Sequence, residues 1–565
     1  MFLSTSNLCG TIMALAGLPP PPGAIHPVPS TRSLVHRLNI CPSASAASQA
    51  QTLTKYLAMA ILETLALIVA TFFAIQFFKQ QRRRYPPGPK GLPVVGNMFD
   101  VPLENGWRIF RDWSREYGSD IVHAETLGMH IVVVNSAKAA KDLFDGRPHI
   151  YSDKDRSTMV LELSGWRRAW ASIPYGDSWR EHRRIFNRHF RTSALTRYHP
   201  RQAKAAHRLL QLLLDAPQDF ASHIRYASGS AILDVVYAFD ALPGDPRLDL
   251  VERAMETLAE ILHAGVFLLD VFPILKHVPA WLPGAQFKRK AAGYKKLVDA
   301  MFEVPYAQLK ADMQEGKAQP CLTTSLLFDC DSDPTPERDE ILMNIAGTAY
   351  AAGSDTSVST LGIFVLAMVL YPEVQSFVQE EIDRVVGRDR LPEISDRGAL
   401  PRVTALIQEV LRWHQPLPLG LPHRAMVDDE YNGYHIPAGS VVLGNAWAIL
   451  HDGATYPDPT AFNPNRFLAA DGALRSDVPF PTEVFGFGRR ICPGRHFAMD
   501  TLFLTVASIL AVFRIEHAVD DGGREVEVQE AFTPHGLSQA EPFKAHFAPR
   551  YAGAEDLVRA TAVMD

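Results

Sequence analysis

Cys492 lies in a glycine-rich stretch whose residue types favour an ionised thiol. The stretch reads Phe-Gly-Phe-Gly-Arg-Arg-Ile-Cys-Pro-Gly from Phe485 to Gly494, and an apolar helix is expected from His496. A thiolate needs nearby positive charge or a metal to remain ionised. Arg490 would supply charge, and the N-terminus of the helix would add N–H dipoles. The stretch therefore predicts a metal-binding or reactive thiolate, and a buried structural cysteine on a turn is the alternative.

A second set of polar residues lies in the middle of a long apolar segment. Thr335 suits a helix N-cap and Pro336 suits the first helical position, so a helix is expected to run to about Leu370. Its middle reads Ala-Gly-Ser-Asp-Thr and ends at Thr356. A glycine inside a helix costs about 1 kcal/mol relative to alanine, so Gly353 is expected to leave room for something that lies against the helix. The non-catalytic alternative for Thr356 is a bond back to a helix carbonyl.

Two pairs of residues are spaced to share one face of a helix. Glu409 and Arg412 are three residues apart in an apolar stretch, where they can pair. This spacing alone is not specific, because the chain repeats it elsewhere, for example at Glu181. Trp179 and Arg183 are four residues apart on another predicted helix. The spacing alone therefore does not identify the function of either pair, which depends on the other motifs of the chain.

Five motifs follow one another across residues 179–494. They are W-x-x-x-R from Trp179, A-G-x-D-T ending at Thr356, E-x-x-R from Glu409, P-x-R-F containing Arg466, and F-x-x-G-x-R-x-C-x-G around Cys492. In residue types and order they resemble the cytochrome P-450 family. The resemblance covers about residues 56–550. It implies the cytochrome P-450 fold, mainly α with a small β-rich lobe, preceded by one N-terminal transmembrane helix.

The resemblance also implies a role for each matched residue. The Cys492 thiolate would be the axial ligand of a haem b iron and would favour O–O cleavage. Thr356 would orient a proton donor at the iron, and Asp355 would link that proton to solvent. The implied cofactor contacts are Trp179, Arg183, Arg424, Phe485, Arg490 and Cys492, with the arginines binding the haem carboxylates. The implied structural lock is Glu409, Arg412 and Arg466, since breaking a buried ion pair costs about 3–5 kcal/mol.

The composition excludes other classes of protein. Of the 565 residues 47% are apolar and 21% charged, and the formal net charge is −6, which argues against binding to nucleic acid. The five cysteines include no Cys-x-x-Cys pair, which disfavours a disulfide scaffold or zinc ribbon and indicates a reducing compartment. No long Gly/Ser linker or repeat divides residues 100–550, so one large globular unit is expected.

The N-terminal region carries a candidate membrane anchor. Residues 56–78 are apolar apart from four polar positions and could cross a hydrocarbon core of about 30 Å. The basic run from Arg82 to Arg84 places the following chain in the cytosol. A buried core helix is the alternative. The expected organisation is a disordered extension (1–55), the anchor (56–78), a basic and proline-rich hinge (79–98), the haem-thiolate catalytic domain (99–550) and a C-terminal tail (551–565).

Short β-prone segments and apolar loops complete the predicted domain. Strands are expected at 120–124, 130–134, 433–436 and 440–443. Among the segments expected to line the substrate site are 416–421 and 532–537, which are mostly apolar.

With the resemblance, these features predict a haem-dependent monooxygenase. It would insert one oxygen atom from O₂ into a lipophilic substrate, and its similarity to basidiomycete members suggests fungal secondary metabolism (terpenoid, polyketide or aromatic) or xenobiotic oxidation. Electrons would come from NADPH through a separate NADPH-cytochrome P-450 reductase, with cytochrome b5 as a second candidate partner. The expected location is the endoplasmic reticulum membrane, single-pass, with the catalytic domain facing the cytosol. The alternatives are a thiolate-haem isomerase or dehydratase acting without O₂ and reductase, and a non-catalytic haem-binding protein.

Overall fold

The 35-residue helix α13 (Pro336–Leu370) begins where its capping residues predicted. The Thr335 hydroxyl accepts a hydrogen bond from the Arg338 backbone N–H at 3.2 Å, and Pro336 occupies the first helical position. The computed structural model describes residues 83–263, 268–329 and 335–564, with a few single residues between 56 and 71. The predicted N-terminal extension and transmembrane anchor lie mainly outside the described residues.

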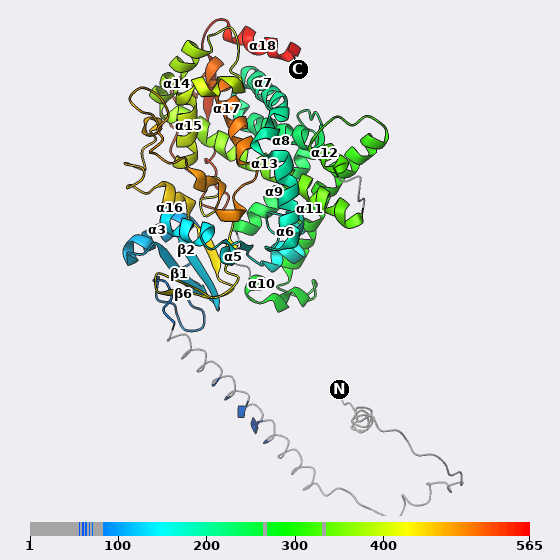
Figure 1. Ribbon diagram of the computed structural model, residues 1–565, viewed down its shortest axis with the longest axis vertical. Helices are drawn as coiled ribbons and strands as arrows, with labels where there is room; N and C mark the ends of the chain where they lie inside the picture. Colours follow the sequence, from blue (N-terminus) through cyan, green and yellow to red (C-terminus); the bar gives the residue numbers. More distant parts are fainter. Residues whose placement is uncertain are drawn as a thin grey trace, which may run out of the picture. The chain divides into compact units, whose positions relative to one another are not determined.

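The residues from Arg83 onward form one mainly helical unit, as expected (Figure 1). Helix α13 packs against helices from both halves of this unit. They are α8 (Phe220–Tyr237), α9 (Pro246–His263), α11 (Gln286–Gln314), α15 (Pro401–Trp413) and α17 (Arg495–Val512). The other α-helices are α3 (Gly106–Tyr117), α4 (Ala137–Ala140), α5 (Pro148–Tyr151), α6 (Asp177–Phe190), α7 (His199–Asp215), α10 (Leu268–Val271), α12 (Leu322–Phe328), α14 (Pro372–Val385), α16 (Ala446–Leu450) and α18 (Ala554–Met564).

The small β lobe contains the predicted strands. A five-stranded sheet has the order β1-β2-β7-β4-β3, with β2 and β7 parallel and the other neighbours antiparallel. Its strands are β1 (Ile121–Thr126), β2 (Met129–Val134), β3 (Asp153–Lys154), β4 (His423–Arg424) and β7 (Val441–Gly444). Two further sheets pair β5 (Asp429–Tyr431) with β6 (Tyr434–Ile436), and β8 (Phe513–His517) with β9 (Ala545–Pro549).

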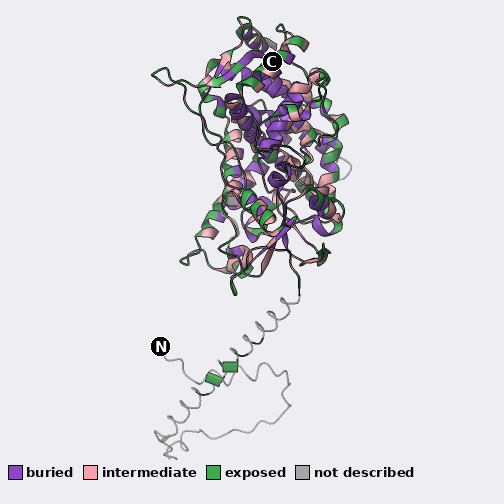
Figure 2. Ribbon diagram, turned by 90° about the vertical axis from the view of Figure 1, so that its left-hand side faces the viewer, coloured by how far each residue is buried: buried purple, intermediate pink, exposed green. Residues whose placement is uncertain are grey.

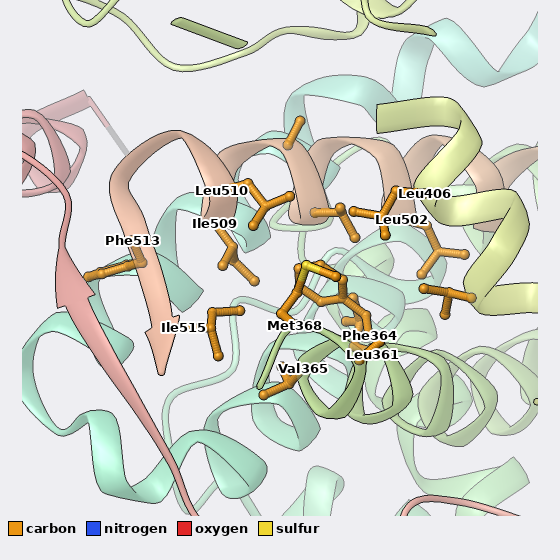
Figure 3. Packing of buried hydrophobic residues seen from close by; sticks show 14 of the residues in the cluster. Leu361, Phe364, Val365, Met368, Leu406, Leu502, Ile509, Leu510, Phe513 and Ile515 are labelled. Carbon is orange, nitrogen blue, oxygen red and sulfur yellow. The ribbon is translucent and has the colours of Figure 1, made fainter. Parts of the chain in front are cut away.

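The main core lies where α13 meets α17 and α15. Figure 3 shows Phe364 and Met368 of α13 directed toward Leu502 and Ile509 of α17, and all four side chains are buried. The purple ribbon in Figure 2 marks this buried helical centre. Both α13 and α17 are long and apolar enough to span a membrane, but 67% of the apolar window of each is buried inside the protein. Their apolar character is therefore explained by the core.

The first residues of the unit are held against the β lobe by a ring-stacking cluster. The Tyr85 ring stacks at 5.1 Å on both His123 and His130, whose Nε2 and Nδ1 atoms lie 2.9 Å apart. Arg83 Nη1 lies 2.7 Å from His435 Nε2. A Cβ on Gly88 would lie 1.9 Å from the His123 carbonyl oxygen, so only glycine fits this close approach. The proline-rich segment is thus packed against strand β1 from its first residues.

This cluster predicts that the β lobe loses stability at mildly acidic pH. Burial lowers the pKa of His123 to about 3, and burial lowers the pKa of His130 to about 4. Below pH 6.5 the two histidines bind protons in the unfolded chain but remain neutral in the folded protein. The free energy of unfolding is therefore highest above that pH and falls as the pH drops toward 4. At pH 5 the loss is about 1–2 kcal/mol per histidine. Urea denaturation at pH 7.5 and pH 5 would measure it.

The double variant His123→Gln/His130→Gln should remove this part of the acid sensitivity. Replacement of the exposed His277 by Gln is the matched control and should leave the acid sensitivity unchanged. An acid-induced loss of the same size in the double variant and in the wild type would contradict the assignment.

Candidate active site

The loop around Cys492 is a tight turn that glycine makes possible. The Cys492 backbone N–H donates to the Phe485 carbonyl at 2.7 Å. Gly486 and Gly488 have φ angles of 84° and 56°, a region that costs other residues strain. A Cβ on Gly488 would also lie 2.5 Å from the Phe144 carbonyl oxygen. The glycines therefore let the loop double back and fix the cysteine at its end.

The sequence predicted that Arg490 supplies positive charge to the Cys492 sulfur. In the structure Arg183 and Arg495 supply that charge instead. Burial raises the pKa of the Cys492 thiol, opposed by a hydrogen bond from the Gly494 backbone N–H and by the charges of Arg183 and Arg495. The raised pKa keeps the thiol protonated unless a metal binds it, since a coordinating thiol loses its proton. The Gly494 N–H and the two guanidinium charges would stabilise the thiolate that a metal requires.

Arg490 instead donates to backbone carbonyls of other segments and has spare hydrogen-bonding capacity. Its Nε donates to the Ser152 carbonyl at 2.8 Å and its Nη2 to the Ile173 carbonyl at 2.9 Å. The guanidinium carbon lies 4.3 Å from the centre of the Trp179 ring. Among the described residues Nη1 is buried without a hydrogen-bond partner, and burial lowers the pKa of Arg490 to about 9. An unpaired buried guanidinium N–H of this kind suits an acidic ligand.

The middle of α13 presents small residues to an accessible face. Ala352 is exposed although most of the helix is buried, and Thr356 lies one turn further on the same side. The Thr356 hydroxyl donates to the Ala352 carbonyl at 2.9 Å. The space at Gly353 was expected to belong to the site, but it is taken up by helix α8. A Cβ on Gly353 would lie 2.7 Å from Cγ1 of Ile232 on α8. The glycine allows α8 to approach α13, and Ala352 and Thr356 form the open face.

Asp355 faces a cavity on another side of α13. Its carboxylate accepts a hydrogen bond from Arg225 Nη1 at 3.1 Å, and Arg225 Nε lies 3.2 Å from a Glu252 carboxylate oxygen. The cavity is about 770 Å³ and is lined by residues of α8, α9 and α13. Sequence reasoning missed Arg225 because it precedes Asp355 by 130 positions and belongs to no recognisable motif.

The three residues expected to form an ion-pair lock lie together. Both Glu409 and Arg412 have fully buried side chains and are joined by two hydrogen bonds of 2.7 and 2.8 Å. Arg466 Nε lies 3.0 and 3.1 Å from the same carboxylate. The Asn463 backbone N–H adds a further bond of 2.7 Å, which the sequence did not predict. The carboxylate is therefore surrounded by four donor groups.

Two of the remaining predicted cofactor residues, Arg183 and Phe485, lie at the Cys492 loop. Arg183 Nη1 donates to the Ile491 carbonyl at 2.7 Å, and burial lowers the pKa of Arg183 to about 10. Phe485 is partly buried and its ring lies 6.4 Å from that of Phe480. Arg424 lies on β4 with its guanidinium against Gly439. The haem contacts of these residues remain predictions.

This arrangement fits haem b. Its iron needs a ligand from the protein, which the Cys492 thiol can supply, and its two carboxylates need cations, which Arg490 and Arg183 can supply. The accessible face of Ala352 and Thr356 suits a flat ring system lying against α13.

Comparisons with known proteins show the family of the chain. The sequence model of the family described as Cytochrome P450 matches residues 86–539. The chain is 41% identical over 485 residues to Cytochrome P450 monooxygenase ple1 of Rhodocybe pseudopiperita, covering 85% of this chain and 92% of that relative. It is 40% identical over 475 residues to Tryptamine 4-monooxygenase of Psilocybe cyanescens (83% and 94%). It is 38% identical over 497 residues to Cytochrome P450 monooxygenase claR of Ampulloclitocybe clavipes (87% and 92%). The chain therefore belongs to the cytochrome P450 family of haem-dependent monooxygenases.

Proposed function

We propose that this protein inserts one oxygen atom from O₂ into a lipophilic small molecule, with haem b as cofactor and electrons from NADPH. The observation that carries this proposal is the middle of α13. Thr356 lies on its accessible face. The adjacent Asp355 lines a cavity and forms an ion pair with Arg225. A hydroxyl beside a carboxylate that reaches solvent suits proton delivery. The relatives' names support oxygenation and give no support to the isomerase or dehydratase alternative.

Each residue of the site has a part in this reaction. Haem b would supply the O₂ activation when bound, and the Cys492 thiolate would hold its iron. Arg183 and Arg490 would hold its carboxylates. The Thr356 hydroxyl would hold a proton donor on the accessible face of α13. Asp355 would restore that proton from the cavity, while Arg225 fixes the direction of its carboxylate.

Partly exposed apolar side chains are proposed to form the walls of the substrate site. They are Leu417, Leu419, Leu421, Phe532 and Leu537. Such a surface favours a terpenoid, polyketide or aromatic substrate, and one relative is named for oxygenation of tryptamine. Microsomes that contain this protein and a reductase, supplied with a panel of terpenes, steroids, polyketides and indoles, test the proposal. Consumption of O₂ and NADPH with a product one oxygen heavier is the expected result; turnover without O₂ would contradict it.

The proposed partners and location follow from the same reaction. NADPH-cytochrome P450 reductase is the proposed electron donor, with cytochrome b5 as a second one. The apolar segment 56–78 and the arginines after it support a single-pass anchor in the endoplasmic reticulum membrane, with the catalytic domain in the cytosol. Protease treatment of sealed microsomes should therefore degrade the catalytic domain; its protection would contradict this orientation.

Replacing Thr356 by valine should separate electron use from product formation. Valine keeps the shape of threonine but removes the hydroxyl, so no group at this position would hold the proton donor. Product per NADPH should fall about tenfold or more, with peroxide released instead. Thr360→Val is the matched control, because the Thr360 hydroxyl also bonds back along the helix (3.0 Å, to the Thr356 carbonyl) but its side chain is buried. Equal coupling in the two variants would count against the role of Thr356.

A further inference from the structure

The substrate turn, residues 531–541, carries two of the proposed substrate walls. Phe532 and Ala540 pair in an antiparallel bridge at its base, and the side chains of Phe532 and Leu537 are partly exposed. A Cβ on Gly536, at the tip, would lie 3.6 Å from Cβ of a leucine on helix α9. The turn therefore reaches α9, and its position determines where these two walls lie.

Ser538 fixes the substrate turn to α13 and to the chain that follows α15. Its backbone N–H donates to the Pro416 carbonyl at 2.8 Å, and its carbonyl accepts from the Ser359 hydroxyl of α13 at 2.7 Å. Its own hydroxyl donates to the Thr533 carbonyl at 2.7 Å and lies 2.7 Å from His414 Nε2. The side chains of Ser538, Ser359 and His414 are all buried. These bonds therefore form a network that is closed to solvent.

His414 is the donor in its bond to Ser538. The Ser538 hydroxyl has a single proton, and the Thr533 carbonyl can only accept it. The hydrogen of the 2.7 Å bond therefore belongs to His414 Nε2. Burial lowers the pKa of His414 well below its usual range, so the ring is neutral and keeps its one proton on Nε2. The same ring stacks on Phe532 at 3.8 Å, and it contacts the substrate turn at two points.

The network also connects the substrate turn to the part of α13 that carries Thr356. Ser359 follows Thr356 by three residues, which is less than one turn of a helix. The Ser359 hydroxyl thus ties the base of the substrate turn to α13 beside Thr356. The distance between the walls on the turn and the Thr356 side chain is therefore set by the bonds to Ser538.

A polar network holds a turn in a more defined position than apolar contacts do. Apolar side chains can repack around a small shift at little cost. A buried hydroxyl or imidazole that loses its partner instead keeps the full cost of its burial. A fully paired network therefore favours one position of the turn over neighbouring positions.

We propose that His414 and Ser359 are positioning residues for the substrate. By fixing Ser538 they hold Phe532 at one distance from Thr356, and so they determine how a lipophilic molecule is seated beside α13. They act through Ser538 and need no contact with the substrate. The inference rests on the proposed function, because the turn is a substrate wall only in an enzyme that oxidises a lipophilic molecule. The opposing hypothesis is that the network contributes to the stability of the fold alone.

The test compares two ligands that bind the haem iron through an imidazole nitrogen. 1-Dodecylimidazole has a chain long enough to reach the substrate walls, whereas imidazole has none. Both are titrated into haem-loaded, full-length protein, and the dissociation constants are read from the shift of the haem absorption band. The ratio of the two affinities measures contact with the walls and is independent of catalytic turnover.

Three variants change the network, and one serves as the control. His414→Phe keeps a ring against Phe532 but removes the donor, and Ser359→Ala removes the bond from α13. His414→Gln places an amide N–H where the imidazole N–H was. His451→Phe is the matched control, because His451 is also buried, stacks on Trp447 at 4.1 Å and bonds to the Trp447 carbonyl at 2.8 Å.

His414→Phe and Ser359→Ala should each lower the affinity ratio about tenfold, the effect of lost contact with about two CH₂ groups. Their affinity for imidazole alone should not change. His414→Gln should restore most of the ratio, because it retains the donor. His451→Phe should lose stability toward urea, since it also breaks a buried hydrogen bond, but should keep the wild-type ratio.

A ratio in His414→Phe within about twofold of the wild-type value would overturn the proposal, and so would an equal fall in His451→Phe. If His414→Phe does not accumulate with haem, Ser359→Ala decides the matter, and an unchanged ratio there would overturn the proposal too. A wild-type protein that lacks the CO spectrum of thiolate-ligated haem, or that binds 1-dodecylimidazole no more tightly than imidazole, would contradict the proposed function itself. The two failures are therefore distinguishable.

Discussion

Cys492→Ser should abolish the optical signature and the activity of the protein. Reduced wild-type protein with CO is expected to absorb at the wavelength typical of thiolate-ligated haem, and the serine variant should lack that band. Product formation should fall at least about a thousandfold, equal to about 4 kcal/mol in the activation barrier, because a serine hydroxyl does not ionise and cannot donate electron density as a thiolate does. Difference spectra and product assays on the same samples would measure both effects.

Cys321→Ser provides the matched control for this experiment. Cys321 is also buried, and it caps helix α12 by accepting a hydrogen bond from the Thr324 backbone N–H. Serine is a good N-cap residue, so the helix should remain intact and the spectrum should not change. A wild-type band in Cys492→Ser would remove Cys492 as the iron ligand.

Glu409→Gln should destabilise the whole catalytic unit. Glutamine has nearly the shape of glutamate but leaves Arg412 and Arg466 without a negative charge, in a place where the Arg412 side chain is fully buried. Removal of one partner from a buried pair costs about 3–5 kcal/mol, against a total stability of about 5–15 kcal/mol for a typical domain. Urea denaturation of the haem-loaded protein should show the loss, and expression should fall with it.

The matched control is Glu181→Gln, which alters the same E-x-x-R spacing in an accessible place. Glu181 pairs with Arg338 and its side chain is 36% exposed, so the expected change is below about 1 kcal/mol. Similar losses in the two variants would mean that the sequence spacing, and not the burial of the carboxylate, determines the effect.

Local sequence rules were enough to predict several elements of the fold. The start of α13 follows from Thr335 and Pro336, whose preferences depend only on the first helical turn. Strands β1 and β2 follow from short β-prone runs. The proximity of Glu409 and Arg412 follows from helix periodicity. In each case the decisive contacts lie within a few residues of one another in the chain.

Other parts of the site depend on contacts between distant segments. The reason for Gly353 lies on α8, at Ile232, and the partner of Asp355 is also on α8. Arg490 donates to the carbonyls of residues 152 and 173, which are far from it in the sequence. No local pattern contains this information, because it arises only when the helices and strands pack.

The cluster around Tyr85 has a practical consequence for shortened forms of the protein. A soluble version made by removing all residues up to 98 would strip Tyr85 from the two histidines and delete the Pro87 carbonyl, which accepts from the His123 backbone N–H at 2.9 Å. The uncovered rings and the unpaired His123 backbone N–H would then face water at the edge of the β lobe. Such an edge favours aggregation. The safer cut is immediately before Arg83, where the compact unit begins.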